Sequence, residues 1–251
     1  MQSRPLEAKV ALITGGTGGI GQAICRALAR DGASIAINYV SNEKAARQLS
    51  EELSGVTNVI SAQGDVARAA NVRRIVSTVE ERLGPVQILV NNAGWTQPQS
   101  FLQTSEADWD RMLEVHLKGA FLLAQAVAPG MIERRSGSII NISSVVARTG
   151  AMMAGVHYCA AKAGLLGLTR ALANQLARHN VRVNAVAPGM IDTSMIGWRT
   201  EEQLQADIAT IPLQRVGHPN EVAEAVRFLA SEASGYITGE TVDINGGQFM
   251  L

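Results

Sequence analysis

The hydrophobic positions along the chain form short apolar runs that alternate with longer segments of helical periodicity. Seven runs rich in valine and isoleucine lie at 10–14, 34–38, 58–62, 87–91, 138–143, 181–187 and 241–245. Alanine, leucine and charged residues recur with a period near 3.6 over 19–31, 42–54, 68–83, 105–128, 156–178 and about 220–231. Near-continuous hydrophobicity is typical of strands that are buried on both faces of a parallel sheet.

Strict alternation of strand and helix predicts right-handed crossovers between parallel strands. We therefore expect a single-domain, Rossmann-type α/β fold: a doubly wound parallel sheet of about seven strands with helices on both faces. No linker rich in proline, glycine or serine divides residues 1–251. Residues 190–218 interrupt the alternation before the last helix, and because long segments of this kind often act as lids, we expect a substrate lid there.

Composition narrows the functional classes. The 22 Lys and Arg residues equal the 22 Asp and Glu residues in number, so the overall charge does not indicate a nucleic-acid partner. Cys25 and Cys159 are the two cysteines, and their helical context fits free thiols in a reducing compartment. The sequence shows neither a signal-peptide h-region nor a run of about 18 apolar residues. We expect a soluble, cytoplasmic protein with no membrane partner and no metal site.

A glycine-rich turn follows the first predicted strand. The sequence GGTGGIG at 15–21 leads into a helix, and glycines there permit positive φ and let the backbone approach a pyrophosphate at the helix N-terminus. This order of strand, glycines and helix predicts a dinucleotide site. Two spacings fit, between which glycines alone do not choose: Gly16, Gly18 and Gly21, or Thr14 with Gly15, Gly19 and Gly21.

The end of the second predicted strand bears on which dinucleotide binds. An NAD site usually carries an acidic residue there for the ribose hydroxyls, but this chain has NYVSN at 38–42. An acid would repel a 2′-phosphate, whereas the hydroxyl of Ser41 and the amide of Asn42 can donate to one. The segment favours NADP(H), with NAD(H) as the alternative, since it holds no arginine.

Seven short motifs follow one another along the chain: TGGTGGIG at 14–21, DV at 65–66, NNAG at 91–94, ISS at 142–144, YCAAK at 158–162, APG at 187–189 and NGG at 245–247. Through them the sequence resembles the classical short-chain dehydrogenase/reductase family over nearly its whole length. Within the family it is most similar to the 3-oxoacyl-[acyl-carrier-protein] reductases, through NYVSNEKA at 38–45, ISSVVA at 142–147 and APGMIDTSM at 187–195.

The resemblance implies a set of cofactor contacts. It selects the second glycine spacing and suggests that Asp65 and Val66 contact the adenine ring. Residues 91–94 would support the sheet and the cofactor ribose. The full set of implied contacts is Gly15, Thr17, Gly19, Ile20, Gly21, Asn38, Ser41, Asp65, Val66, Asn92, Ala93, Gly94, Tyr158, Lys162, Pro188, Gly189, Ile191 and Thr193.

The resemblance also implies catalytic roles. Tyr158 would be the general acid for carbonyl reduction, Lys162 would bind the nicotinamide ribose and lower the pKa of the phenol, and Ser144 would hydrogen-bond the substrate oxygen. Tyr158 and Lys162 share one face of a predicted helix because they are four residues apart, and a nearby ammonium favours a phenolate. Ser143 is the local rival of Ser144, and packing alone is the alternative for the tyrosine and the lysine.

The sequence departs from the family pattern in two places. Many members have an asparagine, which helps to bind a water for proton relay, where this chain has His116 in VHLKGAF. We expect His116 to join the catalytic set, with simple packing in the helix as the alternative. Ser144 and Tyr158 are fourteen residues apart, one more than in many relatives. Met152 and Met153 in that loop either face an apolar substrate or fill space.

The resemblance implies reduction of a ketone, most simply a 3-oxoacyl thioester carried by acyl carrier protein or CoA. Oxidation of another secondary alcohol, sugar or sterol is one alternative, and a non-catalytic dinucleotide sensor is another. The family's usual assembly is a homotetramer. In the carrier-protein enzymes, basic residues near the cleft bind the acidic carrier protein. Arg135 matches one such position, but His179 stands where a second arginine is often found, with Arg178 adjacent, and solvated helix ends are the alternative for both arginines.

The segment 190–213 resembles the mobile substrate lid of the family. Its apolar residues would cover an acyl chain or pack against the body of the protein, and the sequence leaves both open. They are Met190, Ile191, Met195, Ile196 and Trp198.

Overall fold

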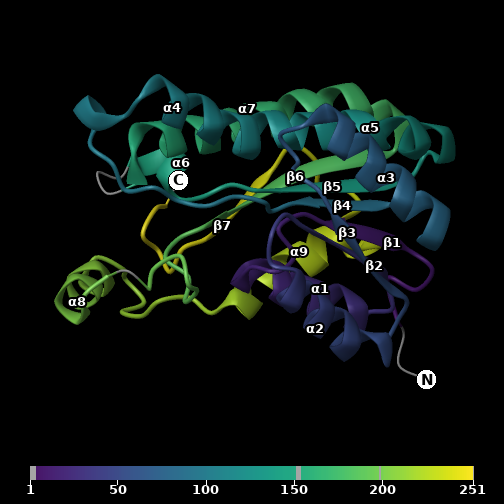
Figure 1. Ribbon diagram of the computed structural model, residues 1–251, viewed down its shortest axis with the longest axis horizontal. Helices are drawn as coiled ribbons and strands as arrows, with labels where there is room; N and C mark the ends of the chain where they lie inside the picture. The colour runs from purple at the N-terminus through teal and green to yellow at the C-terminus, as the bar shows by residue number, and fades with distance from the viewer. Residues whose placement is uncertain (1–3, 151–153, 198, 251) are drawn as a thin grey trace.

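The computed structural model describes residues 4–150, 154–197 and 199–250, so Met152, Met153 and Trp198 lie outside the described residues. The described part contains a seven-stranded parallel sheet in the order β3-β2-β1-β4-β5-β6-β7. This confirms the predicted fold class (Figure 1). The strands are β1 (Val10–Ile13), β2 (Ser34–Tyr39), β3 (Val59–Gln63), β4 (Ile88–Asn91), β5 (Gly137–Ile142), β6 (Val181–Pro188) and β7 (Thr241–Ile244).

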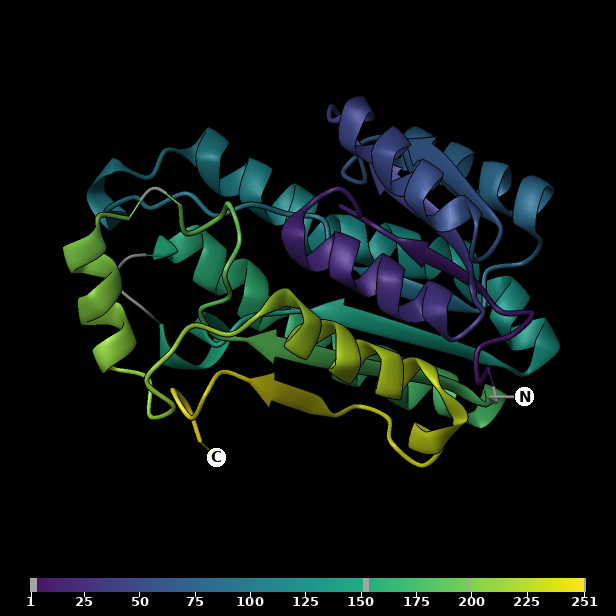
Figure 2. The same ribbon diagram turned by 90° about the horizontal axis from the view of Figure 1, so that it is seen from below.

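Helices cover both faces of the sheet. In Figure 1, α3, α4, α5 and α7 lie above it, and α1, α2 and α9 lie below it. Figure 2 shows α1 and α9 side by side on the lower face, with β7 at one edge of the sheet. The helices are α1 (Gly19–Arg30), α2 (Glu43–Ser54), α3 (Ala69–Leu83), α4 (Glu106–Leu113), α5 (Gly119–Arg134), α6 (Val146–Thr149), α7 (Val156–Leu176), α8 (Glu201–Ala209) and α9 (Pro219–Ala230).

The sheet separates two hydrophobic cores. On β1, Ala11 and Ile13 face the core formed with α1 and α9, whereas Val10 and Leu12 face the core formed with α3 and α5. All four side chains are at most 4% exposed. Successive residues of a strand point to opposite faces, so an apolar run without alternation is what a strand between two helix layers requires.

The predicted helix at 105–128 differs from the structure in two ways. It extends to Arg134, and a π turn, η2 (Glu114–Lys118), joins α4 to α5. Together α4, η2 and α5 form the described helical run, Glu106–Arg134, that is long and apolar enough to cross a membrane. A single such helix is weak evidence for a membrane span, because the core helices of soluble proteins can be equally long and apolar. This run packs against α3 and α7 on the sheet.

The predicted lid segment leaves and rejoins the body at one point. Ile191 pairs with Gly217, where the amide of Asp192 donates to the Gly217 carbonyl at 2.9 Å. The segment contains α8, which the apolar pattern does not predict. A capping box starts this helix, in which the side chains of Thr200 and Gln203 bond to each other's backbone amides.

Candidate active site

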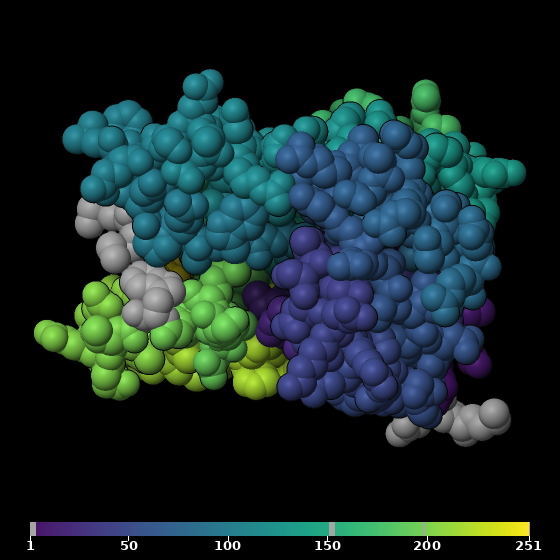
Figure 3. All heavy atoms as spheres, viewed as in Figure 1, coloured from purple at the N-terminus to yellow at the C-terminus, as the bar shows by residue number. Residues whose placement is uncertain are grey.

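The candidate site lies at the carboxyl ends of the central strands. The strand order reverses between β1 and β4, and ligands of open α/β sheets bind at such a switch point. Two neighbouring cavities of about 360 and 330 Å³ share Ile20, Asn92 and Thr193 in their walls. Figure 3 shows the surface hollowed between α4 and the lid segment, with the N-terminal residues visible at the bottom of the hollow. Among the described residues, no cluster of metal-ligating side chains is found.

The glycine turn is crowded at residues of both predicted spacings, since a Cβ on Gly16 would lie 2.9 Å from a methyl group of Ile37. Gly15 has a φ of +59°, and a Cβ there would lie 2.8 Å from the backbone of Ala93. A Cβ on Gly21 would run into the carbonyl of Gly15 and lie 2.9 Å from Nδ2 of Asn92. Gly18, by contrast, has only one atom near its Cβ position, at 3.5 Å. Gly15 and Gly21 are thus required by close approach, and Gly18 is not.

A hydroxyl ties the glycine turn to the strand beside it. Oγ1 of Thr14 accepts from the amides of Asn92 and Ala93 at 2.9 and 3.0 Å, and donates to the Val90 carbonyl at 3.2 Å. Nδ2 of Asn92 in turn donates to the carbonyls of Thr14 and Gly15. These bonds fix the two walls of the cleft relative to each other without using a charged group.

The structure gives Asn38 a role different from the predicted cofactor contact. Its side chain is 1% exposed, and its Nδ2 donates to the carbonyls of Ala62 and Gly64 at 3.0 Å. Its backbone carbonyl accepts from the amide of Gly16 at 2.9 Å. Asn38 therefore supports the glycine turn from below, whereas Ser41 is exposed at the end of β2.

The predicted adenine contacts differ in their surroundings. The carboxylate of Asp65 accepts from the Ala67 amide at 2.9 Å and from Arg111 at 3.0 Å. The side chain of Val66 is 2% exposed and lies in the core. Of the predicted cofactor contacts, those absent from the walls of the two cavities are Thr17, Asn38, Ser41, Asp65, Val66 and Ala93.

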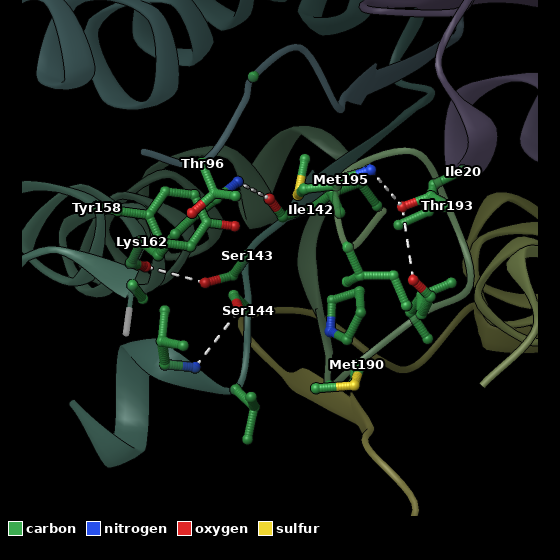
Figure 4. Close-up of a pocket in the computed structure, with 18 of the residues that line it drawn as sticks. Ile20, Thr96, Ile142, Ser143, Ser144, Tyr158, Lys162, Met190, Thr193 and Met195 are labelled. Carbon is green, nitrogen blue, oxygen red and sulfur yellow. Dashed lines mark hydrogen bonds between the residues drawn. The ribbon is translucent and has the colours of Figure 1, made fainter. Parts of the chain in front are cut away.

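Tyr158 and Lys162 enter the larger cavity from the first turns of α7 (Figure 4). They are 8% and 5% exposed, and Nζ of Lys162 lies 5.6 Å from the centroid of the phenol ring. Nζ donates to the Ile142 carbonyl at 2.7 Å. Burial raises the pKa of Tyr158 to about 12, against a hydrogen bond with Ser144 that lowers it. Burial also lowers the pKa of Lys162 to about 7.

The two serines at the end of β5 have different tasks. Oγ of Ser143 donates to the Lys162 carbonyl at 2.9 Å and so holds α7 against β5. Ser144, in contrast, forms a side-chain hydrogen bond with Tyr158. The geometry therefore favours Ser144 over its rival as the hydroxyl that acts together with the tyrosine.

His116 lies against Tyr158 rather than merely within its own helix. It sits in the π turn, is 3% exposed, and its ring meets the phenol edge-to-face at 5.3 Å. Nε2 accepts from the amide of Trp95 at 3.2 Å. A Cβ on Gly94 would overlap the imidazole. Burial, followed by the charge of Lys162, holds the pKa of His116 well below its ordinary value, so the ring is neutral.

The segment predicted to be a lid forms the opposite wall of the cavity. Met190, Ile191, Met195 and Ile196 all line it, so these residues face the site and not only the body. Figure 4 shows Thr193 and Met195 beside Ile20. A Cβ on Gly19 would lie 2.7 Å from the methyl group of Thr193. The glycine at position 19 thus lets Thr193 pack closely against the glycine turn.

Sequence reasoning missed several lining residues. Thr96 follows the NNAG motif and Gln248 follows the NGG motif, so their positions next to motifs were a usable signal. Arg199 and Asp207 also line the cavity and form an ion pair at 2.6 Å. That pair depends on how the lid turns before α8, which no periodicity encodes.

The predicted carrier-protein residues lie far from this site. The side chain of Arg135 donates to the Arg178 carbonyl at 3.2 Å, and Arg178 donates to His179 at 3.1 Å. This basic patch lies at the amino ends of β5 and β6. The six residues of β5 separate it from the candidate catalytic residues by about 20 Å.

Comparison with known proteins places the chain in a family. A family model described as "Enoyl-(Acyl carrier protein) reductase" matches residues 15–248. Nodulation protein G of Azospirillum brasilense is 45% identical over 244 residues, which cover 96% of this chain and 98% of that protein. The chain belongs to the short-chain dehydrogenase/reductase family.

Two further relatives of this short-chain dehydrogenase/reductase carry an explicit activity in their names. The 3-oxoacyl-[acyl-carrier-protein] reductase FabG of Aquifex aeolicus is 43% identical over 97% of this chain and 98% of its own. The protein of the same name from Staphylococcus aureus (strain Mu50 / ATCC 700699) is 39% identical over 96% and 98%. The chain is therefore an oxidoreductase that uses a nicotinamide dinucleotide, and the cradle around Gly15 and Gly21 fits such a cofactor.

Proposed function

We propose that this short-chain dehydrogenase/reductase reduces a 3-oxoacyl thioester to the 3-hydroxy compound with NADPH. The observation that carries the proposal is the buried set of Ser144, Tyr158 and Lys162 in the wall of a largely apolar cavity that adjoins the glycine turn. The names of the FabG relatives support a ketone as substrate. The acyl-carrier-protein reductases in the comparisons also support a thioester over a sugar or sterol.

Each catalytic side chain has a task that its surroundings suit. The bound nicotinamide would supply the hydride. Tyr158, whose pKa of about 12 keeps the phenol protonated at neutral pH, donates its proton to the ketone oxygen. Ser144 holds that oxygen by a hydrogen bond as negative charge develops on it. Lys162 binds the ribose, and in its protonated form it stabilises the phenolate that remains after proton transfer.

The preference for NADP(H) rests on the end of β2. Residues 38–42 contain no carboxylate that would repel a 2′-phosphate. Ser41 is exposed there, and the α2 N-terminus begins directly afterwards, where Oδ1 of Asn42 accepts from the Ala45 amide at 3.1 Å. Helix N-termini favour anions.

We further propose a cytoplasmic homotetramer that accepts substrates on acyl carrier protein. The exposed aromatic residues Trp109 on α4 and Phe121 on α5, 37% and 43% exposed, support an interface along this helical run. A carrier protein on the patch around Arg135 and Arg178 would serve the active site of a neighbouring subunit, because the patch lies at the opposite end of its own sheet.

The proposed function is tested by following NADPH and NADH oxidation at 340 nm with acetoacetyl-CoA. We expect oxidation of NADPH, and a loss of at least about 100-fold in kcat for Tyr158→Phe, which removes the proton donor. Tyr236→Phe is the matched control, since Tyr236 is fully exposed, and it should match the wild type. If the protein binds NADPH but oxidises neither cofactor with acetoacetyl-CoA, the proposed reaction is wrong. Other alcohols, enoyl thioesters and a sensor role would then be tested.

A further inference from the structure

An ion pair lies in the wall of the larger cavity, although most of that wall is apolar. Nε of Arg199 donates to Oδ2 of Asp207 at 2.6 Å, and both side chains border the cavity together with Met195 and Ile196. The side chain of Arg199 is 16% exposed and that of Asp207 is 38% exposed. An apolar lining would be enough to cover an acyl chain, so the pair serves some other purpose in this wall.

The stability of α8 does not explain the pair. Arg199 precedes the N-cap residue Thr200, and Asp207 lies in the last turn of the helix. The helix dipole favours acidic residues near the N-terminus and basic residues near the C-terminus. Each member of the pair therefore lies at the end of α8 that disfavours its charge. The capping box of Thr200 and Gln203 already supplies hydrogen bonds at the start of the helix.

The second oxygen of the Asp207 carboxylate is the part of the pair that can bind a ligand. Oδ2 is held by Arg199, whereas no other described residue donates a hydrogen bond to Oδ1. An ionised carboxylate only accepts hydrogen bonds, so a ligand must bring an N–H or an O–H group. The two charges of the pair balance each other, and a cation or an anion would be repelled by one of them. The pair therefore suits a neutral donor.

A 3-oxoacyl thioester carries one kind of group with this character. Its ketone and its thioester carbonyl are acceptors only. The first N–H along such a substrate belongs to the amide beyond the sulfur, in the pantetheine arm that CoA and acyl carrier protein share. Ser144 and Tyr158 border the same cavity as the ion pair. With the ketone held by these two residues, the thioester side of the substrate can extend along the lid segment.

We propose that Oδ1 of Asp207 accepts the amide N–H of the pantetheine arm, and that Arg199 fixes the carboxylate in place for this contact. This inference rests on the proposed function, which supplies the thioester. The contact makes the site selective for pantetheine thioesters over ketones on simple esters. An ester oxygen in place of the amide N–H would lose the hydrogen bond and would also bring a second acceptor against the carboxylate.

The test compares two thioesters that differ in one group. Acetoacetyl-N-acetylcysteamine carries the amide, and its analogue carries an ester oxygen in place of the amide N–H. In the wild type we expect a KM at least about tenfold lower for the amide than for the ester, because the hydrogen bond is to a charged group. In Asp207→Ala the two KM values should become equal. Asp207→Asn keeps an acceptor oxygen and should retain part of the difference.

The matched control is Glu202→Ala, which removes an exposed acidic residue from the same helix and should keep the full difference. No residue of α8 belongs to the two large hydrophobic cores of the described chain, so we expect these variants to fold. Equal KM values in the wild type would overturn the inference. An equal loss with both thioesters in Asp207→Ala would also overturn it, since the pair would then only shape the lid segment.

Two further comparisons separate the source of the arm and the proposed function. Acetoacetyl-CoA and acetoacetyl carrier protein share the arm, so Asp207→Ala should raise both KM values by the same factor. A rise with only one of them would place the contact outside the arm and overturn the inference. If neither small thioester is reduced, the proposed function is wrong. Binding of both thioesters to the NADPH-loaded protein, followed by nicotinamide fluorescence, then decides the inference. A preference for the amide that is lost in Asp207→Ala supports it, and no preference overturns it.

Discussion

At the scale of single residues, burial sets the protonation of Tyr158 and Lys162, the proposed catalytic pair. The pKa of Lys162 is about 7 in the folded protein, against about 10.4 in an unfolded chain. Between these values the unfolded chain binds more protons than the folded protein, so the free energy of unfolding rises with pH, by at most about 1.4 kcal/mol per pH unit. Below pH 7 Lys162 is protonated in both the folded and the unfolded protein, so its contribution to the free energy of unfolding no longer changes with pH.

The measurement compares the unfolding of wild type and Lys162→Met between pH 7 and 8.5, at equal protein concentration. We expect the stability of the wild type relative to the variant to increase across this range. Groups other than Lys162 titrate in both proteins, so their contributions to the free energy of unfolding cancel when the two proteins are compared. One such group is Cys25, whose pKa burial raises to about 12. A difference that does not change with pH would show that the lysine is not desolvated in the folded state.

The contact between Gly94 and His116 makes a second prediction at this scale. Gly94→Ala would force its methyl group into the imidazole and should cost about 1–3 kcal/mol of unfolding free energy, as overpacking does. Adding His116→Asn removes the ring and should restore part of that loss. Gly167→Ala is the control, because no atom lies within 4 Å of its Cβ position in α7, and it should be neutral or stabilising. Equal losses in the single and double variants would contradict the contact.

At the scale of elements, the glycine turn predicts different effects for substitutions at Gly21 and Gly18. Gly21→Ala would press against the Gly15 carbonyl and the Asn92 side chain, so NADPH should bind at least about tenfold more weakly, a loss of about 1.4 kcal/mol. Gly18→Ala makes only an ordinary contact, 3.5 Å from the Gly15 carbonyl, and should bind NADPH as the wild type does. Fluorescence titration with NADPH measures both. Loss of binding in both variants would instead support the spacing of Gly16, Gly18 and Gly21.

The elements also show what the sequence could and could not predict. All seven strands were predictable from their short apolar runs, although only the inner strands are buried on both faces, whereas β3 alternates and β7 is half-buried throughout. Helix α8 was missed because its residues, EEQLQADIA, show no apolar stripe, although Thr200 and Gln203 form a capping-box signature that was readable. The π turn had no such signal. Hence the motif that carries His116 was visible, but its contact with Tyr158 was not.

At the scale of the whole molecule, the site and the basic patch lie at opposite ends of the sheet. If acyl carrier protein docks on the patch, Arg135→Glu combined with Arg178→Glu should raise the KM for a carrier-linked ketoacyl substrate by about tenfold, through lost charge complementarity. The KM for acetoacetyl-CoA should not change. Arg73→Glu on α3, also exposed, is the control. Equal effects on both substrates would exclude docking at this patch.

The π turn has a consequence for how such a site can change over time. A π turn accommodates one residue more than an α turn within a continuous helix. Loss of one codon within 114–118 would therefore leave a regular α turn with α4 and α5 in place, and would change the side chain that meets Tyr158. The surroundings of the tyrosine can thus evolve by a change in length, while every codon of the catalytic motif stays as it is.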